Sequence, residues 1–559
     1  MTIFQMYSFR RLAAAVVACG ALAHSVYAER VFVGILEMDS YQSVVYGASA
    51  FSRVADLPIA LETINATLTQ NLSLPSFSGI SPTETLRIVQ TVDSALPLGE
   101  GNPANVALIP LSDNGEAVLK SFSEAYGTRA KKGVSQIFEH PKDTNLASRV
   151  AVAVTGHYLF SSHSPEAIDW VWKNREQLIN APPQTIPGTF RILVNPQRFA
   201  DVLGTRSEKA ASVINLDKLL RDFETLSFSL TLDGQALTLT LRGKPLAGSA
   251  LKSLQNSLRP PAPNLWNGLP DNAFFVSLSA CSAPNFWNAY LAEPNLQLMR
   301  PVTGLAPQDA FSGDRLLYLA PTKTKTGLCF VQIEPVKNVE AVRQAIQKLN
   351  TVKTDGCIEL VRKPTRSKAL LQIESYDVKL HPPATLTKDG KAEEPSIMFT
   401  LAALFLKQAV LEATVKDGYL ICFIGPADTF ENELPELSFS EKTLTLQRRI
   451  VGQDPALENS ALRLGSSLHV ANLLRHVVSI MPGVKPEHLR VLPLGGDGAN
   501  FGIGQQDRGE TLTASLRIQS NEIAALQRIN RDGREVLQEL FFQMFTHQMM
   551  ILKEPSAEK

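Results

Sequence analysis

The fold class is indicated most clearly by residues 223–241, FETLSFSLTLDGQALTLTL, in which apolar and polar side chains alternate on both sides of Asp233-Gly234. A period of two places one kind of side chain on each face of a strand, and Asp-Gly is a favoured turn between paired strands. The stretch therefore predicts an antiparallel hairpin. Turns join the predicted strands more often than crossover helices do, so we expect a mainly antiparallel sheet rather than a doubly wound nucleotide-binding sheet.

A similar succession of segments occurs in both halves of the chain. Each half contains an apolar strand, then a strand leading into a helix, then a hairpin followed by a helix, and finally a closing hairpin. The paired segments are 30–36 with 272–278, 106–119 with 329–342, 152–167 with 413–428, and 223–241 with 490–518. Residue identity between the halves is low, so the similarity is one of order and pattern. It predicts an α+β protein with two similar lobes, each a mainly antiparallel sheet covered by helices.

These segments also set the expected domain boundaries. Residues 29–258 form the first α+β repeat and residues 272–530 the second. The Pro-rich residues 259–271 lie between them and predict a stiff, extended linker. Residues 531–559 form a C-terminal helix and tail.

The predicted C-terminal helix, residues 533–552, is rich in large apolar side chains. We expect it to pack back on one of the lobes. The alternative is that Phe541, Phe542, Phe545 and Met549 dock a partner or a membrane surface.

The first 28 residues have the layout of a secretory signal peptide. The basic pair Arg10-Arg11 precedes an apolar run, and Val26-Tyr27-Ala28 supplies a small-residue cleavage site. We expect cleavage before Glu29 and an exported protein of the periplasm or cell envelope. The alternative is a lipid anchor at Cys19, because Val16-Val17-Ala18-Cys19 is similar to a bacterial lipobox.

Charge and hydropathy argue against two kinds of partner. The chain has 54 Lys and Arg against 54 Asp and Glu, and removal of the signal peptide leaves 52 against 54. Binding to nucleic acid requires a positive field that neutralises phosphates, so we expect no nucleic acid partner. No run of about 20 apolar residues follows the signal, so we expect no transmembrane helix in the mature chain.

The cysteines indicate neither a metal site nor a redox pair. Cys281, Cys329, Cys357 and Cys422 are far apart and form no C-x-x-C pair, whereas structural zinc and dithiol chemistry need clustered thiols. An oxidising compartment allows one disulfide, with Cys329 and Cys357 the closest pair in sequence, and four buried thiols are the alternative. We expect no metal and no cofactor.

Three short motifs are those of serine β-lactamases and penicillin-binding proteins: S-x-x-K at 249–252, S-D-N at 112–114 and K-T-G at 325–327. Their order argues against the enzyme, because S-x-x-K comes first in that family and S-D-N comes first here. Ser249, and Ser112 or Asp113, stand where helices are predicted to begin, which is a capping position. We therefore expect no catalytic residues and keep a serine hydrolase using Ser249 with Lys252 as an alternative.

Two further patterns are expected to be structural. His469 and His476 lie seven residues apart on a predicted helix, about 10.5 Å at 1.5 Å per residue, which is too far to share one metal ion. The glycines around Asp497 look like part of a dinucleotide loop, but the third glycine is missing and a strand follows. We expect a hairpin turn there.

With Gly248-Ser249 closing the first lobe and Gly268-Leu269-Pro270-Asp271 entering the second, the chain resembles exported, tandemly duplicated bacterial α+β proteins of unknown function. The resemblance implies an architecture and no activity. Together with the export signal and the absence of a catalytic constellation, it leads us to expect a non-enzymatic envelope protein that binds or scaffolds a partner. The partner would be another envelope protein or, alternatively, a lipid-like ligand carried by the protein.

Overall fold

The computed structural model has an α+β fold, as the sequence predicts, and the chain divides into two compact units. Unit 1 comprises residues 1–252 and 510–513, and unit 2 comprises residues 253–509 and 514–559. The structure describes residues 30–540 with gaps at 58, 94–103, 140–148, 180–187, 208–215, 260–264, 266–268, 271, 281–309, 324–326, 350–357, 369–370, 381–408, 435–456, 458–460, 482–483, 496–497 and 507–508.

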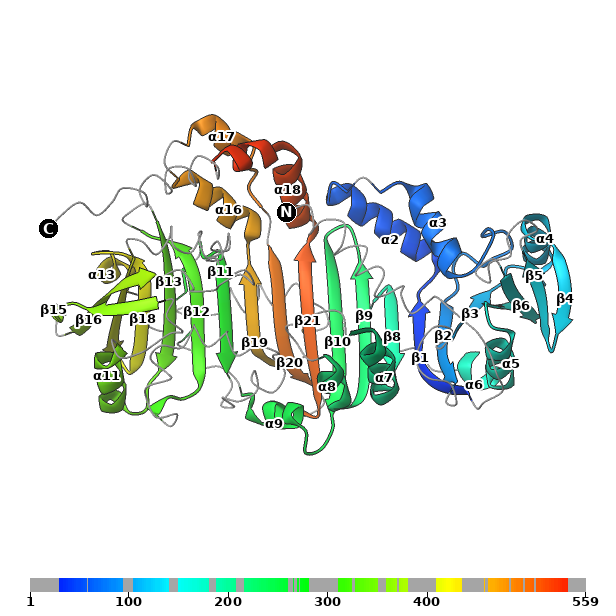
Figure 1. The fold of residues 1–559 in the computed structure, drawn as a ribbon, viewed down its shortest axis with the longest axis horizontal. Helices are drawn as coiled ribbons and strands as arrows, with labels where there is room; N and C mark the ends of the chain where they lie inside the picture. Colours follow the sequence, from blue (N-terminus) through cyan, green and yellow to red (C-terminus); the bar gives the residue numbers. More distant parts are fainter. Residues whose placement is uncertain are drawn as a thin grey trace, which may run out of the picture. The chain divides into compact units, whose positions relative to one another are not determined.

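The described strands of unit 1 form one antiparallel sheet in the order β10-β9-β8-β1-β2-β3-β7-β6-β5-β4 (Figure 1). Short turns join the paired neighbours β4–β5, β6–β7 and β9–β10, helices lie between β1 and β2 and between β8 and β9, and β8 and β7 return to pair with β1 and β3. The strands are β1 (Arg30–Met38), β2 (Leu86–Asp93), β3 (Ala104–Pro110), β4 (Thr128–Lys132), β5 (Ser135–Glu139), β6 (Arg149–Thr155), β7 (Tyr158–Ser162), β8 (Phe190–Val194), β9 (Phe223–Leu232) and β10 (Ala236–Pro245).

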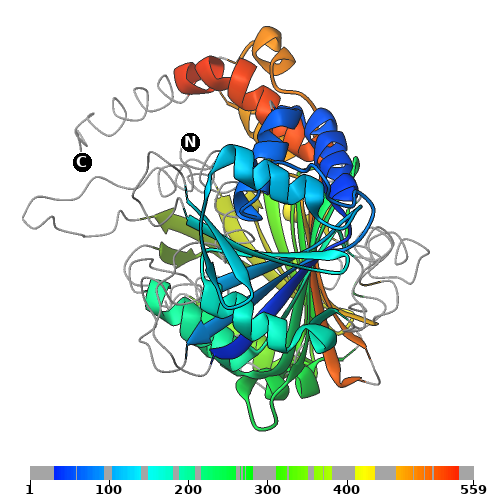
Figure 2. The ribbon, with the colours of Figure 1, turned by 90° about the vertical axis from the view of Figure 1, so that its right-hand side faces the viewer.

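Helices cover both faces of this sheet (Figure 2). Phe122 of α4 and Ile109 of β3 belong to the core on one face, and Ile168 of α5 and Phe160 of β7 to the core on the other. The helices are α2 (Tyr41–Val54), α3 (Leu61–Asn71), α4 (Glu116–Ala125), α5 (Pro165–Lys173), α6 (Arg175–Ile179), α7 (Pro196–Ser207), α8 (Leu216–Arg221) and α9 (Ala250–Ser257).

The hairpin predicted from residues 223–241 is confirmed as the pair β9–β10. The Asp233 carboxylate closes its turn by accepting hydrogen bonds from the backbone N–H groups of Gln235 (2.7 Å) and Ala236 (2.8 Å). An Asp side chain that bonds the backbone two or three residues ahead stabilises a tight turn by itself. The local sequence is therefore sufficient to specify this hairpin.

The described strands of unit 2 pair antiparallel in the order β20-β19-β11-β12-β13-β18-β17-β16-β14, and β15 also pairs with β16. The strands are β11 (Phe275–Ala280), β12 (Asp314–Pro321), β13 (Leu328–Pro335), β14 (Ile358–Arg362), β15 (Arg366–Lys368), β16 (Leu371–Leu380), β17 (Ala409–Lys416), β18 (Tyr419–Pro426), β19 (Ala461–Leu468), β20 (Ala499–Gln506) and β21 (Thr511–Gln519).

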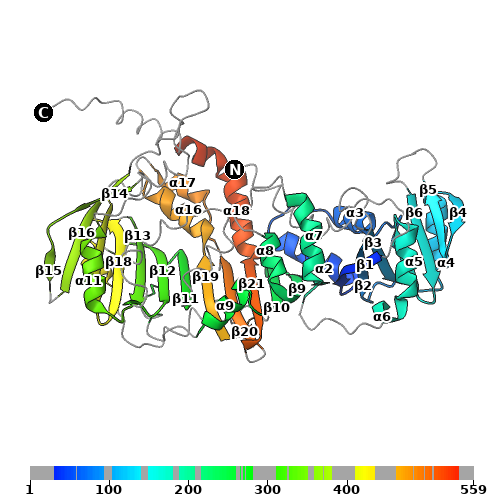
Figure 3. The same cartoon turned by 60° about the horizontal axis from the view of Figure 1, so that its bottom comes forward.

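Unit 2 has a helical layer of its own, in which α16 lies beside α18 (Figure 3). Ala471 and Val478 of α16 are buried there against Ala525 and Ile529 of α18. The helices are α11 (Val339–Gln347), α13 (Phe430–Glu433), α16 (Val470–Ser479), α17 (Pro486–Arg490) and α18 (Ser520–Asp532). No helix among the described residues is long and apolar enough to cross a membrane.

The two units share one strand order. Strands β9-β8-β1-β2-β3-β7-β6-β5-β4 of unit 1 match β20-β19-β11-β12-β13-β18-β17-β16-β14 of unit 2, position for position. Helices follow at the same points: α4 and α11 after the strand β3 or β13, and α7 and α16 after β8 or β19. The pairing register can therefore be used to match individual residues of the units.

The helix expected at the end of the segment 413–428 begins later than predicted, at Phe430. Pro165 is the first residue of α5, and the Ser164 hydroxyl caps that helix by accepting from the Ala167 N–H, as expected. Its counterpart Pro426 instead ends β18, where it pairs with Ala409, and α13 begins only at Phe430. Proline has no N–H group to donate to a neighbouring strand, so it is disfavoured inside a sheet but tolerated at a strand end. Pro426 occupies such a strand end.

The described parts of the two predicted flanking segments pack into unit 2. In the stretch 259–271, Leu265 is fully buried in the sheet core, and Arg259 forms an ion pair with Asp314 (2.9 Å). At the C-terminus, residues 534–540 are helical. Leu537 and Leu540 are buried in the α16–α18 layer, and the rest of the predicted helix lies outside the described residues.

Candidate functional site

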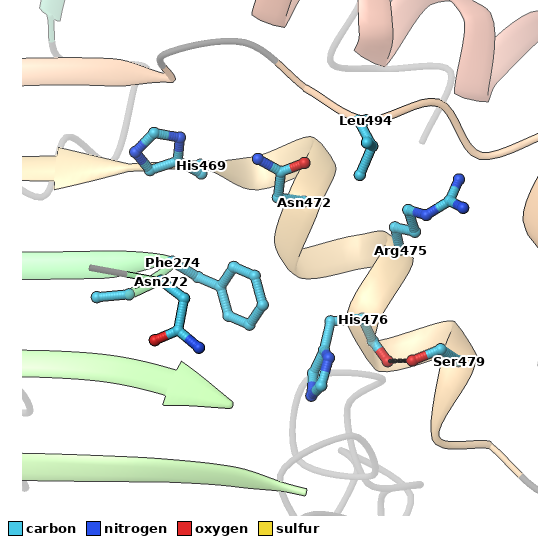
Figure 4. Close-up of a pocket in the computed structure, with 9 residues that line it drawn as sticks. Asn272, Phe274, His469, Asn472, Arg475, His476, Ser479 and Leu494 are labelled. Atoms are coloured by element: carbon cyan, nitrogen blue, oxygen red, sulfur yellow. Dashed lines mark hydrogen bonds between the residues drawn. The ribbon is translucent and has the colours of Figure 1, made fainter. Parts of the chain in front are cut away.

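A pocket of about 390 Å³ opens in unit 2, where β11 begins and β19 runs into α16 (Figure 4). One face of α16 forms a wall, and the residues before β11 and the loop after α17 form the others. The lining residues are Asn272, Ala273, Phe274, His469, Asn472, Arg475, His476, Ser479 and Leu494.

The pairing of β11 with β19 brings these segments together. Leu468 at the end of β19 is the partner of Phe275, and the next backbone N–H, of His469, donates to the Phe274 carbonyl (2.8 Å). The chain then turns into α16. His469 makes no side-chain cap there, and the buried Glu522 carboxylate accepts the N–H of Ala471 instead (2.7 Å). This bond satisfies one of the unpaired donors at the start of the helix.

The spacing of residues on α16 separates its two faces. Arg475 and His476 lie three and four residues after Asn472, and Ser479 lies three residues after His476, so the four share one side of the helix, and that side faces the pocket (Figure 4). The opposite side is buried in the helical layer. The pocket wall is thus a polar stripe on an otherwise apolar helix.

Part of the hydrogen-bonding capacity of this stripe holds the pocket together. The Asn472 Oδ1 accepts from the Gly495 N–H (2.9 Å). Nη1 of Arg475 donates to the carbonyl of Leu489 (2.7 Å) and to that of Leu492, tying α16 to α17. These bonds use one polar atom of each side chain. A bound molecule could use the amide nitrogen of Asn472 and the other guanidinium nitrogens of Arg475.

His476 is held against an aromatic ring. The ring centroids of His476 and Phe274 are 5.2 Å apart at an interplanar angle of 39°, and Phe274 points toward α16 in Figure 4. Nε2 of His476 lies 3.2 Å from the Gly327 carbonyl, and because a carbonyl oxygen can only accept, Nε2 is the donor of this bond. The imidazole is thus held between an aromatic ring and a backbone carbonyl.

Unit 1 differs at the position of His476, whereas the residues of α7 that match Asn472 and Arg475 are Arg198 and Asp201, which are polar and form an ion pair with each other. There the N–H of Asn195 donates to the Val33 carbonyl (2.8 Å), which is the same link as that between His469 and Phe274. The seventh residue of the following helix is Val202 in α7 and His476 in α16. Val202 packs with Val33 and Val92 in a closed apolar cluster. The same backbone arrangement is thus filled by valines in one unit and opened as a polar pocket in the other.

The residues of the three enzyme-like motifs have structural roles where they are described. The Ser249 hydroxyl accepts the Lys252 N–H (3.0 Å) at the start of α9, as expected of a cap. The predicted cap at Ser112 or Asp113 is wrong, because the N-cap residue of α4 is Gly115, which receives no side-chain cap; the Asp113 carboxylate accepts the Gly115 N–H (2.7 Å) in the turn before the helix. Lys325 and Thr326 lie outside the described residues. The carbonyl of Gly327 faces His476.

Other predicted residues can be placed only in part. Cys19 and the apolar residues Phe541, Phe542, Phe545 and Met549 lie outside the described residues, so the structure gives no account of them. His469 and His476 line one pocket, but no group of three or more metal-ligating side chains occurs among the residues that the structure describes.

The two described cysteines, Cys329 and Cys422, are buried free thiols, so the Cys329–Cys357 disulfide considered from the sequence is not formed. Burial raises the pKa of Cys329 to about 12 and raises that of Cys422 as well. Because the thiolate is the reactive form, we expect neither to react in the folded protein. Peptide mapping after iodoacetamide treatment should find both unmodified in buffer and both alkylated in denaturant. Labelling in buffer would contradict this.

In comparisons with known proteins, no family model, curated protein or solved structure matches the chain. The class of protein is therefore described from its own fold and pocket. It is an α+β protein of two topologically matching units, with an open polar pocket in the second.

Proposed function

We propose that this chain is an exported, non-enzymatic binding protein and that the pocket beside α16 is its binding site. The difference between the units carries the proposal. At one position of the shared topology, unit 1 has Val202 in a closed valine cluster, whereas unit 2 has His476 facing a pocket. Replacing a close-packed apolar contact by half-buried polar groups costs stability unless the groups gain partners. His476 and Arg475 each have a partner within the protein, and a ligand or partner segment would supply partners for their remaining polar atoms.

The chemistry of the lining favours binding over catalysis and over lipid transport. Figure 4 shows two imidazoles, a guanidinium and two carboxamides around the opening, with one phenyl ring. A site for a lipid-like ligand is lined predominantly by apolar side chains. The serine hydrolase alternative is disfavoured because the Ser249 hydroxyl is engaged as a helix cap. We therefore favour a polar small molecule or a polar side chain of another envelope protein.

Export is proposed on the sequence of residues 1–28, which has the order of a basic pair, an apolar run and a small-residue site. The neutral overall charge and the absence of a long basic run continue to argue against nucleic acid as the partner.

Native mass spectrometry of the protein purified from its own envelope fraction, with sequencing of the N-terminus, tests the proposal. We expect a mature start at Glu29 and an additional bound mass. His476→Val installs the side chain found in unit 1 and should remove that mass. Val202→Ala perturbs the matching position of unit 1 and should retain it. Bare protein without a cross-linked partner in intact cells would contradict the proposal, as would cargo that both variants retain.

A further inference from the structure

The charge and shape of the pocket indicate the class of ligand. We infer that the ligand presents an anionic group, a carboxylate or phosphate, joined to a flat apolar group; this rests on the proposed function. Among the residues that the structure describes, Arg475 is the lining residue with a formal charge at neutral pH, and none of them lines the pocket with a carboxylate. An anion is therefore the charged group that this wall favours.

The nearest acidic residue to consider is Glu522. Its side chain is 1% exposed and is bonded to the N–H of Ala471, at the amino end of α16. That end of a helix carries partial positive charge, which compensates the carboxylate. Glu522 is thus part of the support of α16 and does not line the pocket.

The donors of α16 fit the anionic group. Asn472 and Arg475 are three residues apart on the helix. Asn472 accepts from Gly495 through its oxygen and keeps its amide nitrogen as a donor, and Arg475 has guanidinium nitrogens beyond the one that donates to Leu489 and Leu492. A planar carboxylate or a phosphate can accept from an amide nitrogen and a guanidinium nitrogen together.

The remaining lining fits a flat apolar group. Phe274 presents a half-buried ring at the pocket, and Leu494 is 73% exposed in the loop after α17. A flat group seated on Phe274 would remove both from water, with aromatic stacking as an added gain. The volume of about 390 Å³ is that of a site for a small molecule.

The probe is 4-fluorobenzoate, observed by ¹⁹F NMR with the full-length protein. The control compound is 4-fluorobenzylamine, which has a similar size and a positive charge. We expect broadening and shift of the benzoate signal with saturation, and at least tenfold weaker binding of the amine. Asn472→Asp keeps the oxygen that accepts from Gly495 and adds a negative charge. It should weaken benzoate binding at least tenfold and leave amine binding unchanged or stronger.

Two further variants separate charge from structure. Arg475→Lys should retain part of the benzoate binding, whereas Phe274→Ala should lower the affinity for both probes. Equal binding of benzoate and benzylamine, or benzoate binding unaffected by Asn472→Asp, would overturn the inference. In that case, native cargo that His476→Val removes would still support the proposed function. If neither probe binds and purified protein carries no cargo, both proposals fall.

Discussion

Glu37→Leu is expected to destabilise unit 1 by about 3–5 kcal/mol, because it removes one partner of a buried charge cluster. The Glu37 carboxylate is 2% exposed and lies 3.0 Å from Nε of Arg87 and 3.6 Å from Nε of Arg191. Both guanidinium groups are almost as buried, at 11% and 13% exposed. A leucine at position 37 would remove the ion pair that the buried Arg87 makes with this carboxylate.

The matching residues of unit 2 suggest the rescue. Glu37 and Arg87 are register partners on β1 and β2, and the same positions on β11 and β12 are Leu278 and Leu316, both fully buried. Replacing a buried ion pair by packed apolar residues is often neutral or stabilising. The double variant Glu37→Leu/Arg87→Leu should therefore recover most of the loss, while Arg191 keeps its 2.5 Å ion pair with Asp39.

The local stability of unit 1 is measured by unfolding the protein in urea and using hydrogen-exchange mass spectrometry of the β1 and β2 peptides as the readout. The single and double variants form a double-mutant cycle, and a coupling of at least about 2 kcal/mol between positions 37 and 87 is expected. Additive losses would show that the carboxylate and guanidinium act independently. Peptides from β16 and β17 report on unit 2 and serve as the internal control.

The elements of this fold that follow from local sequence were predictable. The β9–β10 turn depends on Asp233 and its two backbone bonds, and the α5 start depends on Ser164 and Pro165. Each is a contact within a few residues. The strand order depends instead on contacts between distant residues. β8 pairs with β1 across more than 150 residues, and the sequence of neither strand identifies the other as its partner. The repeated order of segments indicated two similar lobes without giving that order.

The candidate site was beyond sequence reasoning for the same reason. His469 and His476 could be placed on one helix, and their spacing excluded a shared metal ion. Their common pocket with Phe274 depends on the pairing of Leu468 with Phe275, which only the sheet establishes. The helix after β19 carries Asn472, Arg475, His476 and Ser479 on one side. A polar side is also expected of any amphipathic helix that covers a core, so this pattern alone did not identify a pocket.

Tyr376→Ala is expected to lower the stability of unit 2 by about 3–5 kcal/mol, since its side chain is fully buried in the core beneath α11. Its hydroxyl donates to the Ile346 carbonyl near the end of that helix (2.5 Å), and burial raises its pKa to about 12, which keeps the donor protonated. Tyr376→Phe should cost only about 1 kcal/mol, the net value of one hydrogen bond.

The same position in unit 1 is already a phenylalanine. Phe138 is the register partner of Val150, as Tyr376 is of Leu411. The ring centroids of Phe138 and of Phe122 on α4 are 5.3 Å apart. Phe138→Ala should therefore cost as much in unit 1 as Tyr376→Ala costs in unit 2, and each loss should appear in the exchange of its own unit's peptides. If either substitution lowers protection equally in both units, the chain unfolds as one cooperative body. Loss confined to one unit would show that each sheet holds its own core, so that the pocket of unit 2 could be engineered without disturbing unit 1.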